Sequence, residues 1–428
     1  MNNKTEDKMA NSSEKIALVP RLRFPEFRDT PGWEIHQLGQ AADFVSERIQ
    51  LEKVKLENYV STENILPDFG GVVKAAKLPT IGSVTRFRIN DVLISNIRPY
   101  LKKVWRSDKD GGASNDVIVL RAKRDLLEQF LPFILRNDAF IDYVMKGARG
   151  VKMPRGDISL MRQYPIGYPS LAEQQKIADC LVSFDALITM EGQKLDALKT
   201  HRKGLMQQLF PAEDEALPKL RFPEFRDKGE WGQKKFGQLC HFVRGPFGGA
   251  LKKDVFVKDG YAVYEQSHAI YSDFNSFRYF ITEEKRKELK RFSVRPGDII
   301  MSCSGTMGKF SVIPDGAKDG VINQALLKLT VNQGYHLGFV KLTLELPINQ
   351  EKLLSQSAGG AIKNVVGVSE MKEIELCLPS EEEQQKIASC LTYLDNLITA
   401  QAQKLEALKA YKKGLMQQLF PVLDEVLA

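Results

Sequence analysis

The sequence predicts an α+β protein of two α/β domains and two long helices, in which the second half of the chain repeats the frame of the first. Three observations predict it: a helical segment occurs twice, a short motif opens each half, and the divergent stretches between them contain strand patterns. We expect a disordered tail over 1–19, domains over 20–168 and 218–378, helices over 169–211 and 379–421, a linker over 212–217 and a tail over 422–428.

The repeat decides this architecture. The segment from Pro169, PSLAEQQKIADCLVSFDALITMEGQKLDALKTHRKGLMQQLFP, returns from Pro379 as PSEEEQQKIASCLTYLDNLITAQAQKLEALKAYKKGLMQQLFP, with 29 of 43 aligned positions identical. The opening motifs are PRLRFPEFRD from Pro20 and PKLRFPEFRD from Pro218. Because the frame is duplicated and the enclosed domains differ, the chain is built to present two different surfaces in one geometry.

Each repeated segment predicts one long helix. Ser170 and Ser380 are expected N-caps, with Glu173 and Glu383 completing a capping box, and a proline follows each segment. Apolar residues recur in steps of three and four, which is the spacing of a coiled-coil seam. The predicted seam comprises Ile177, Leu181, Phe184, Ile188, Leu195, Leu198, Leu205, Ile387, Leu391, Leu394, Ile398, Leu405, Leu408 and Leu415.

Polar residues interrupt this seam at Glu191 and Arg202, matched by Gln401 and Lys412. Such residues either fix the register and partner of a helix pair or are merely tolerated in a frayed seam. The residues alone leave the pairing direction open. Antiparallel pairing would relate the two halves by an approximate two-fold axis and would place Glu191 near Gln401.

The net charge of +7 lies on the domains. Residues 20–169 and 218–379 each carry 24 basic and 18 acidic groups, whereas residues 170–210 and 380–420 are each neutral. A basic domain surface is typical of nucleic-acid binding through phosphate contacts. Any single basic cluster can be an ordinary solvated surface, but the same excess on both domains favours DNA.

The candidate DNA-binding residues come from five stretches. Two are the basic runs Lys74–Arg106 and Lys285–Arg295. Two are glycine-containing segments, GARGVKMPRG before the first long helix and SAGGAIKN before the second, and the fifth is the loop SCSGTMGK. The candidates are Arg86, Arg88, Arg98, Lys102, Lys103, Arg106, Arg149, Lys152, Arg155, Lys285, Arg286, Lys287, Arg291, Ser304, Thr306, Lys309, Lys363 and Asn364.

Both domains contain a strand–loop–strand pattern, around Val92 and around Ile299. The loops, NIRPYLKK and SCSGTMGK, combine backbone amides with a basic side chain, which suits a phosphate. An ordinary turn explains the same pattern.

Catalytic signatures are missing from the sequence. CSGTMGKF departs from a P-loop at Cys303 and Phe310, and no GxSxG, HExxH or [DN]PP[YF] motif occurs. The five cysteines form no CxxC pair, so we expect free thiols in a reducing cytoplasm and no metal site. No run is apolar enough for a membrane helix, and the first residues lack the apolar core of a signal peptide.

Five motifs stand out in the sequence: EQQKIA at Glu173–Ala178 and Glu383–Ala388, KLxALK, KGLMQQLFP, LRFPEF and GDIIMSCSGTMGK. Together they resemble motifs of the specificity subunits of type I restriction–modification enzymes. The resemblance extends from about Pro20 to Pro421. It implies two target-recognition domains on an antiparallel helix pair, each reading one half of a split, asymmetric DNA site. It also implies that the helices set the unread spacer.

The resemblance further implies partners: double-stranded DNA, two methylation subunits and two restriction subunits. The whole complex would use S-adenosylmethionine, ATP and magnesium, with no cofactor and no catalytic residue in this chain. Two other classes compete with this interpretation. A scaffolding protein would lack salt-dependent DNA affinity, and an enzyme such as a fused nuclease or methyltransferase would be active alone with its cofactor.

Overall fold

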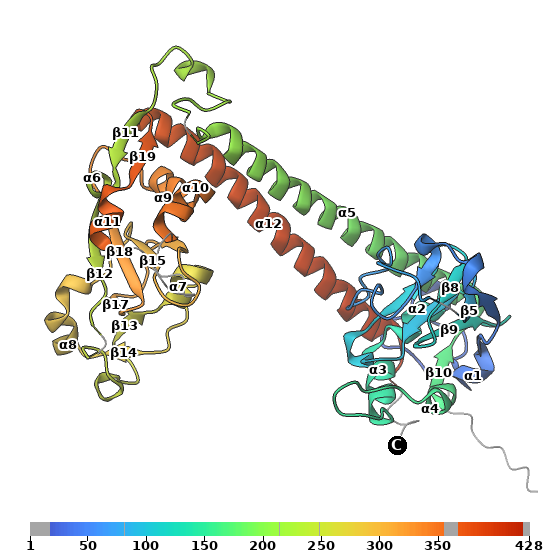
Figure 1. Ribbon diagram of the computed structural model, residues 1–428. Helices are drawn as coiled ribbons and strands as arrows, with labels where there is room; N and C mark the ends of the chain where they lie inside the picture. Colours follow the sequence, from blue (N-terminus) through green and yellow to red (C-terminus); the bar gives the residue numbers. More distant parts are fainter. Residues whose placement is uncertain (1–17, 81, 214, 248, 355–366, 423–428) are drawn as a thin grey trace, which may run out of the picture. The chain divides into compact units, whose positions relative to one another are not determined.

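The computed structural model describes residues 18–80, 82–213, 215–247, 249–354 and 367–422 (Figure 1). The chain divides into two compact units, unit 1 with residues 1–192 and 403–428, and unit 2 with residues 193–402. Each unit contains one α/β domain, the start of the long helix that follows this domain, and the end of the other long helix. The duplicated frame predicted from the repeat is confirmed.

The two long helices are α5 (Leu171–Leu209) and α12 (Glu381–Leu419), each of 39 residues. Ser170 and Ser380 cap them as predicted, since each hydroxyl accepts a hydrogen bond from the amide three residues on, at 3.4 and 3.5 Å. The second half of the predicted capping box is wrong. Both glutamate carboxylates turn instead to an arginine of the opening motif.

This arginine explains why the opening motif is duplicated with the helix. Arg23 donates two hydrogen bonds of 2.7 Å to Glu173, and Arg221 donates bonds of 2.8 and 2.7 Å to Glu383. Both glutamate side chains are only 1% exposed. A buried carboxylate requires a charged, hydrogen-bonded partner, which a local backbone amide does not replace.

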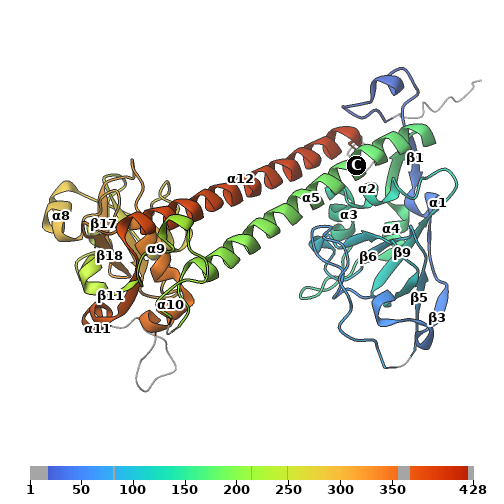
Figure 2. The ribbon, with the colours of Figure 1, turned by 90° about the horizontal axis from the view of Figure 1, so that it is seen from above.

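Within each unit the two long helices lie antiparallel, side by side (Figure 2). In unit 1, Asp185 pairs with Lys412 and Glu191 with Lys404, both at 2.5 Å, so partner numbers fall along α12 as they rise along α5. In unit 2, Arg202 pairs with Asp395 at 2.5 Å. Three of the four polar interruptions, Glu191, Arg202 and Lys412, are therefore ion-paired.

Each of the fourteen predicted seam positions is buried or half-buried. Their packing partners change along the helix. Ile177 and Leu181 lie in the core of the first domain together with Leu419, and Ile387 and Leu391 lie in the core of the second domain. The ends of the stripe thus serve the domain cores as well as the helix pair.

The described residues of unit 1 form three sheets. The first sheet pairs β1 (Glu34–Gln37) with β10 (Pro165–Tyr168). The central sheet has the strand order β2 (Ala42–Phe44), β9 (Val117–Ala122), β6 (Val92–Ser95), β7 (Val104–Arg106). The outer sheet has the strand order β3 (Arg48–Gln50), β5 (Ser83–Phe87), β8 (Gly111–Ala113), β4 (Tyr59–Val60). The short helices are α1 (Leu38–Ala41), α2 (Leu131–Leu135), α3 (Asp138–Lys146) and α4 (Ile158–Gln163).

Unit 2 repeats this plan. Its sheets are β11 (Gly232–Lys235) with β19 (Glu375–Leu378); a central sheet β12 (Cys240–Arg244), β18 (Leu326–Val331), β15 (Ile299–Ser302), β16 (Phe310–Val312); and an outer sheet β14 (Phe280–Ile281), β13 (Tyr261–Tyr264), β17 (Gly320–Ile322). Its short helices are α6 (Phe236–Leu239), α7 (Gln266–Tyr271), α8 (Glu283–Glu288), α9 (Leu337–Glu345), α10 (Pro347–Leu354) and α11 (Val368–Glu373). The predicted strand–loop–strand patterns are β6 with β7 and β15 with β16.

Each central sheet is the middle layer of its unit. Side chains alternate along β6, so that Val92 and Ile94 face the core shared with the long helices while Leu93 faces the outer sheet. In β15, Ile299 and Ile300 divide in the same way. The central sheets therefore match, whereas the outer sheets differ in strand number and order.

An aromatic group anchors the far end of each long helix. Phe420 stacks on Phe130 with ring centroids 5.3 Å apart, and Phe210 stacks on Phe339 at 5.2 Å. A tryptophan, Trp33 or Trp231, meets each pair edge-on. Each domain thus holds the start of its own helix and the end of the other one.

The predicted tail over 1–19 ends too late. Leu18 is buried in the core of unit 1 and exchanges two backbone hydrogen bonds with Trp33, because the apolar residues after the polar start pair with the first strand region. Residues 1–17 lie outside the described ranges. Within those ranges, no helix has a stretch long and apolar enough to cross a membrane.

Candidate nucleic-acid interface

In unit 2 three segments follow the ends of β12 and β15 in the central sheet and of β13 in the outer sheet, and this end of the domain is called here loop edge 2. Its centre is the turn between β17 and β18, residues 323–325. Three backbone hydrogen bonds define it: Cys303 N to Ala325 O (2.8 Å), Asn323 N to Tyr264 O (2.9 Å) and Gly245 N to Leu326 O (2.9 Å). Three segments therefore begin together: residues 245–247, residues 265–272 with α7 (Gln266–Tyr271), and loop 303–309.

Unit 1 repeats this arrangement around residues 114–116, called loop edge 1. Asn96 N donates to Asp116 O at 2.8 Å, Ser114 N to Val60 O at 2.8 Å, and Val45 N to Val119 O at 2.8 Å. The ends of β2, β4 and β6 thus correspond to the ends of β12, β13 and β15. Loops that extend from a rigid sheet edge are suited to contacting a ligand.

Loop edge 1 brings together two basic stretches that lie far apart in the sequence. Arg98 N donates to Pro154 O at 2.8 Å, and Gly156 N to Asn96 O at 3.2 Å, so that loop 96–103 and loop 147–157 form one surface. Arg155 also reaches the central turn, where it pairs with Asp116 at 3.0 Å.

The exposed side chains of this surface are both basic and apolar. Arg98 and Lys152 are exposed, and the Arg149 side chain is 88% exposed. Val151 is fully exposed, at 104%, beside Met153 at 51%. Cations next to exposed apolar groups are suited to contacting phosphates and bases together.

Other predicted residues of unit 1 have closer intramolecular partners than Arg149, which pairs with Asp157 at 3.6 Å. Lys102 pairs with Asp138 at 2.5 Å, and Lys103 donates to Thr62 O at 2.6 Å. Burial and the nearby Arg98 lower the pKa of Lys103. These two lysines hold the loop in place.

Three further candidates of unit 1 lie away from these loops along the sheets. Arg86 and Arg88 both pair with Glu47, at 3.0 and 3.1 Å, and Arg106 is half-buried at the end of β7. The candidate cations of the run Lys74–Arg106 are therefore not equally available to a ligand.

Loop 303–309 is exposed at Ser304, Thr306 and Lys309. Two of its amides are already occupied, because Gly308 N donates to Ser302 O and Lys309 N to the Ser302 hydroxyl. The suggested phosphate contact of this loop stays a prediction. The loop is a compact turn that presents side chains.

The second basic run lies elsewhere in unit 2. Residues 285–295 include α8 and lead into the start of β15, whereas loop edge 2 lies at the end of this strand; Figure 1 draws α8 and α7 on different sides of the unit. Lys285 pairs with Glu288 and Lys287 with Glu283 in the same helix.

Of the four remaining candidates, one contacts an aromatic ring, one is exposed and two are not described by the structure. Arg286 lies over the Tyr261 ring at 4.3 Å, and Arg291 is exposed. Lys363 and Asn364 fall outside the described residues.

Sequence reasoning missed several residues at loop edge 2. Arg244 ends β12 and is exposed, Phe247 is 95% exposed, and Gln266 and Tyr271 belong to α7. Burial raises the pKa of the Cys303 thiol to about 11, opposed by the Arg244 cation, so Arg244 extends over the base of loop 303–309. Single residues without neighbouring charges gave no sequence signal.

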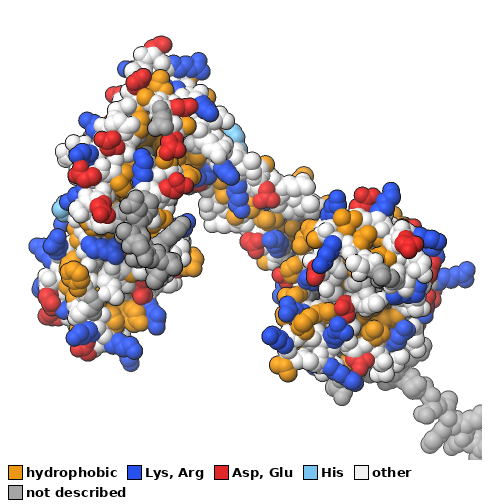
Figure 3. Space-filling view, viewed as in Figure 1, with side chains coloured by type: hydrophobic (Ala, Val, Ile, Leu, Met, Phe, Trp, Pro, Cys, Tyr) orange, Lys and Arg blue, Asp and Glu red, His pale blue; other side chains and the backbone are white. Residues whose placement is uncertain are grey.

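Net charge alone does not locate an interface. On the face seen in Figure 3, Lys and Arg side chains are spread over both units and mixed with acidic ones. The geometry of the loop edges is therefore a better guide than the distribution of charge.

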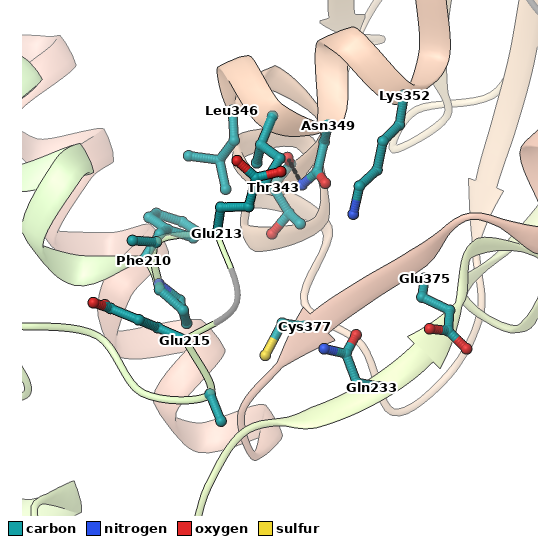
Figure 4. A pocket seen from close by; sticks show the side chains of 14 residues that line it. Phe210, Glu213, Glu215, Gln233, Thr343, Leu346, Asn349, Lys352, Glu375 and Cys377 are labelled. Carbon is teal, nitrogen blue, oxygen red and sulfur yellow. Dashed lines mark hydrogen bonds between the residues drawn. The ribbon is translucent and has the colours of Figure 1, made fainter. Parts of the chain in front are cut away.

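The cavity shown in Figure 4 does not suit DNA. It measures about 430 Å³ and lies between the end of α5, the linker, α10 and β19. Glu213, Glu215 and Glu375 line it against one cation, Lys352. This excess of carboxylates repels phosphates.

The chain is similar to known proteins along most of its length. The model of the Type I restriction modification DNA specificity domain matches residues 32–200 and 228–410, once in each half. The type I restriction enzyme MjaVIII specificity subunit of Methanocaldococcus jannaschii is 22% identical over 413 residues, which cover 93% of both chains. The putative MjaX specificity subunit of the same organism is 24% identical over 323 residues, which cover 71% of this chain and 70% of the relative.

Solved structures share the fold. The S subunit of a type I restriction–modification system from M. genitalium matches with a TM-score of 0.60 and 16% identity, covering 95% of this chain and all (100%) of that one. A chain from a type I R-M system studied for complex assembly matches with a TM-score of 0.54 and 21% identity, covering 91% and 98%. With two matched domains spanning most of its length, the chain belongs to the type I restriction–modification DNA specificity family.

Proposed function

We propose that this chain reads a bipartite, asymmetric DNA target, with loop edge 1 contacting one half-site and loop edge 2 the other. The observation that carries the proposal is the duplicated edge: equivalent strand ends present loops of different chemistry. Loop edge 1 exposes Arg98, Arg149 and Lys152, whereas loop edge 2 exposes Ser304 and Thr306 beside the cations Arg244 and Lys309. Bases are distinguished by the side chains that meet their edges, so two different sets read two different sequences.

The identical frame supports a second part of the proposal. Both long helices carry nearly the same surface, so a partner that binds one copy finds the same surface on the other. We propose that two methylation subunits dock there, that two restriction subunits complete the complex, and that the helix pair sets the number of unread bases. S-adenosylmethionine, ATP and magnesium would be bound by those partners, and this chain would be non-catalytic and act in the cytoplasm.

The test replaces Arg98, Arg149 and Lys152 with alanine together, in the complex with its methylation subunits. DNA affinity should fall, and the slope of log affinity against log salt should fall by about one for each phosphate that the variant no longer neutralises. The control replaces Lys123 and Arg124, two exposed cations beyond the opposite end of β9. Unchanged affinity and slope in a folded triple variant would place the DNA interface elsewhere.

A further inference from the structure

We propose that Gln266 reads an adenine in the half-site of unit 2, with Ser304 as the residue that positions its carboxamide. This inference rests on the proposed function of loop edge 2 and adds the base class and the reading residue. Gln266 begins α7, directly after the end of β13, and is half-exposed.

A buried histidine fixes the backbone at this position. His268 is 3% exposed, and its Nδ1 accepts a hydrogen bond of 2.9 Å from the Glu265 amide. Its Nε2 donates to Ser276 O at 3.1 Å, and its ring stacks on Phe277 with centroids 4.8 Å apart. The start of α7 is therefore held from both sides of the imidazole, so Gln266 extends from a rigid support.

The neighbouring loop fixes the side chain. The Ser304 hydroxyl donates to Gln266 Oε1 at 3.0 Å. Gly305 has a φ of +58°, and a Cβ added there would lie 3.4 Å from Gln266 Nε2, so the carboxamide lies along this glycine. The loop thereby orients the amide and leaves its outer side open.

The hydrogen-bonding groups that remain match adenine. Among the described residues, Nε2 has no hydrogen-bond partner, and Oε1 keeps a second lone pair beside the one used by Ser304. Adenine presents an acceptor at N7 and a donor at N6 in the major groove, which glutamine contacts with its amide donor and its carbonyl oxygen. The carboxamide carries no net charge to attract a phosphate, and its adjacent donor and acceptor match a base edge better than a phosphate, which only accepts.

Unit 1 differs at the equivalent place. Val60 and Tyr264 are equivalent strand ends, since each carbonyl accepts from the central turn of its edge, and Thr62 therefore corresponds to Gln266. In unit 1, loop 96–103 contacts the backbone at Thr62, because Lys103 Nζ donates to Thr62 O at 2.6 Å. The same pair of loops is linked in both units, but only unit 2 presents an amide.

The experiment uses the full chain in complex with its methylation subunits and a randomised pool of duplex DNA. Bound sequences are selected for the parent chain and for Gln266→Ala, Ser304→Ala and Gln333→Ala. Gln333 is an exposed glutamine in the turn after β18, at the opposite end of this strand from loop edge 2. The control variant should select the parent motif.

We expect Gln266→Ala to lose the adenine preference at one position of one half-site, with discrimination falling about tenfold. The other half-site should not change. Ser304→Ala should keep adenine as the preferred base but bind the target several-fold more weakly, because it releases the amide without removing it. An unchanged motif with unchanged discrimination in Gln266→Ala would overturn the inference, as would loss of a base other than adenine.

A further variant separates failure of this inference from failure of the proposed function. Arg244 and Lys309 are exposed cations on two loops of the same edge, and both are replaced with alanine. If this double variant loses affinity while Gln266→Ala keeps its discrimination, only the inference about Gln266 fails. If neither variant changes binding, loop edge 2 does not contact DNA and the proposed function fails with it.

Discussion

The two units are alike where the domains meet the long helices and different where the loop edges lie. At the helices, Arg23 with Glu173 and Arg221 with Glu383 are equivalent pairs with nearly equal distances and burial. At the loop edges, both units present cations and exposed apolar groups, and unit 2 adds the Ser304 and Thr306 hydroxyls and the Gln266 amide. The difference teaches that the frame fixes geometry, while the loops are free to change chemistry without changing the fold.

The largest expected effect tests the equivalence of the two frames. Glu173→Ala leaves the Arg23 cation buried without its carboxylate, which should lower the free energy of unfolding by about 3 kcal/mol. Glu383→Ala should cost the same, because Arg221 is equally enclosed. Urea unfolding of both variants measures this. Effects that differ by more than a factor of two would show that the two frames are not energetically equivalent.

A smaller effect should distinguish the two units along the helix pair. Asp185 pairs with Arg136 at 3.2 Å and with Lys412 at 2.5 Å, and both cations are mostly buried. Asp395 pairs with Arg202, which is more exposed. We expect Asp185→Ala to cost about 2 kcal/mol and Asp395→Ala less than about 1 kcal/mol. Equal losses in the same urea assay would contradict this ranking.

The pH dependence of Asp185→Ala gives the smallest effect. Burial lowers the pKa of Lys412 below 10.5, against the opposing effect of Asp185. Between this lowered pKa and 10.5 the unfolded chain binds more protons, so the contribution of Lys412 to stability rises with pH. The deficit of the variant should therefore shrink as the pH is raised toward 10. A stability deficit of Asp185→Ala that grows over this pH range would show that the charge of the buried Lys412 is not what destabilises the variant.

The repeated frame, an opening motif and a long helix in each half, could be predicted because nearly the same residues occur twice in the sequence. The repeat indicated the helices, and their three-four spacing indicated the seam, since a face that packs along its whole length needs apolar residues at regular intervals. The partner of Glu173 could not be found in this way, because Arg23 is 150 residues away in the sequence. A local capping box was the nearest partner that spacing alone could offer.

The loop edges were predicted only in part. Charge counting found Arg98 and Arg149 but could not show that their loops join through backbone hydrogen bonds. It also included Lys285 among the DNA-binding candidates, although Glu288 lies three residues on and pairs with it in the same helix. Gln266 had no sequence signal, because a single amide gains meaning only from the loop that orients it.

Each unit should read its own half-site through its own loop edge, and a domain exchange tests this most directly. The measurement replaces residues 218–378 with the corresponding domain of a relative that has another target, and maps methylated sites genome-wide with the native partner subunits present. We predict that one half-site changes to that of the relative while the other half-site stays unchanged. A hybrid that assembles with its partners but changes both half-sites, or neither, would contradict the claim.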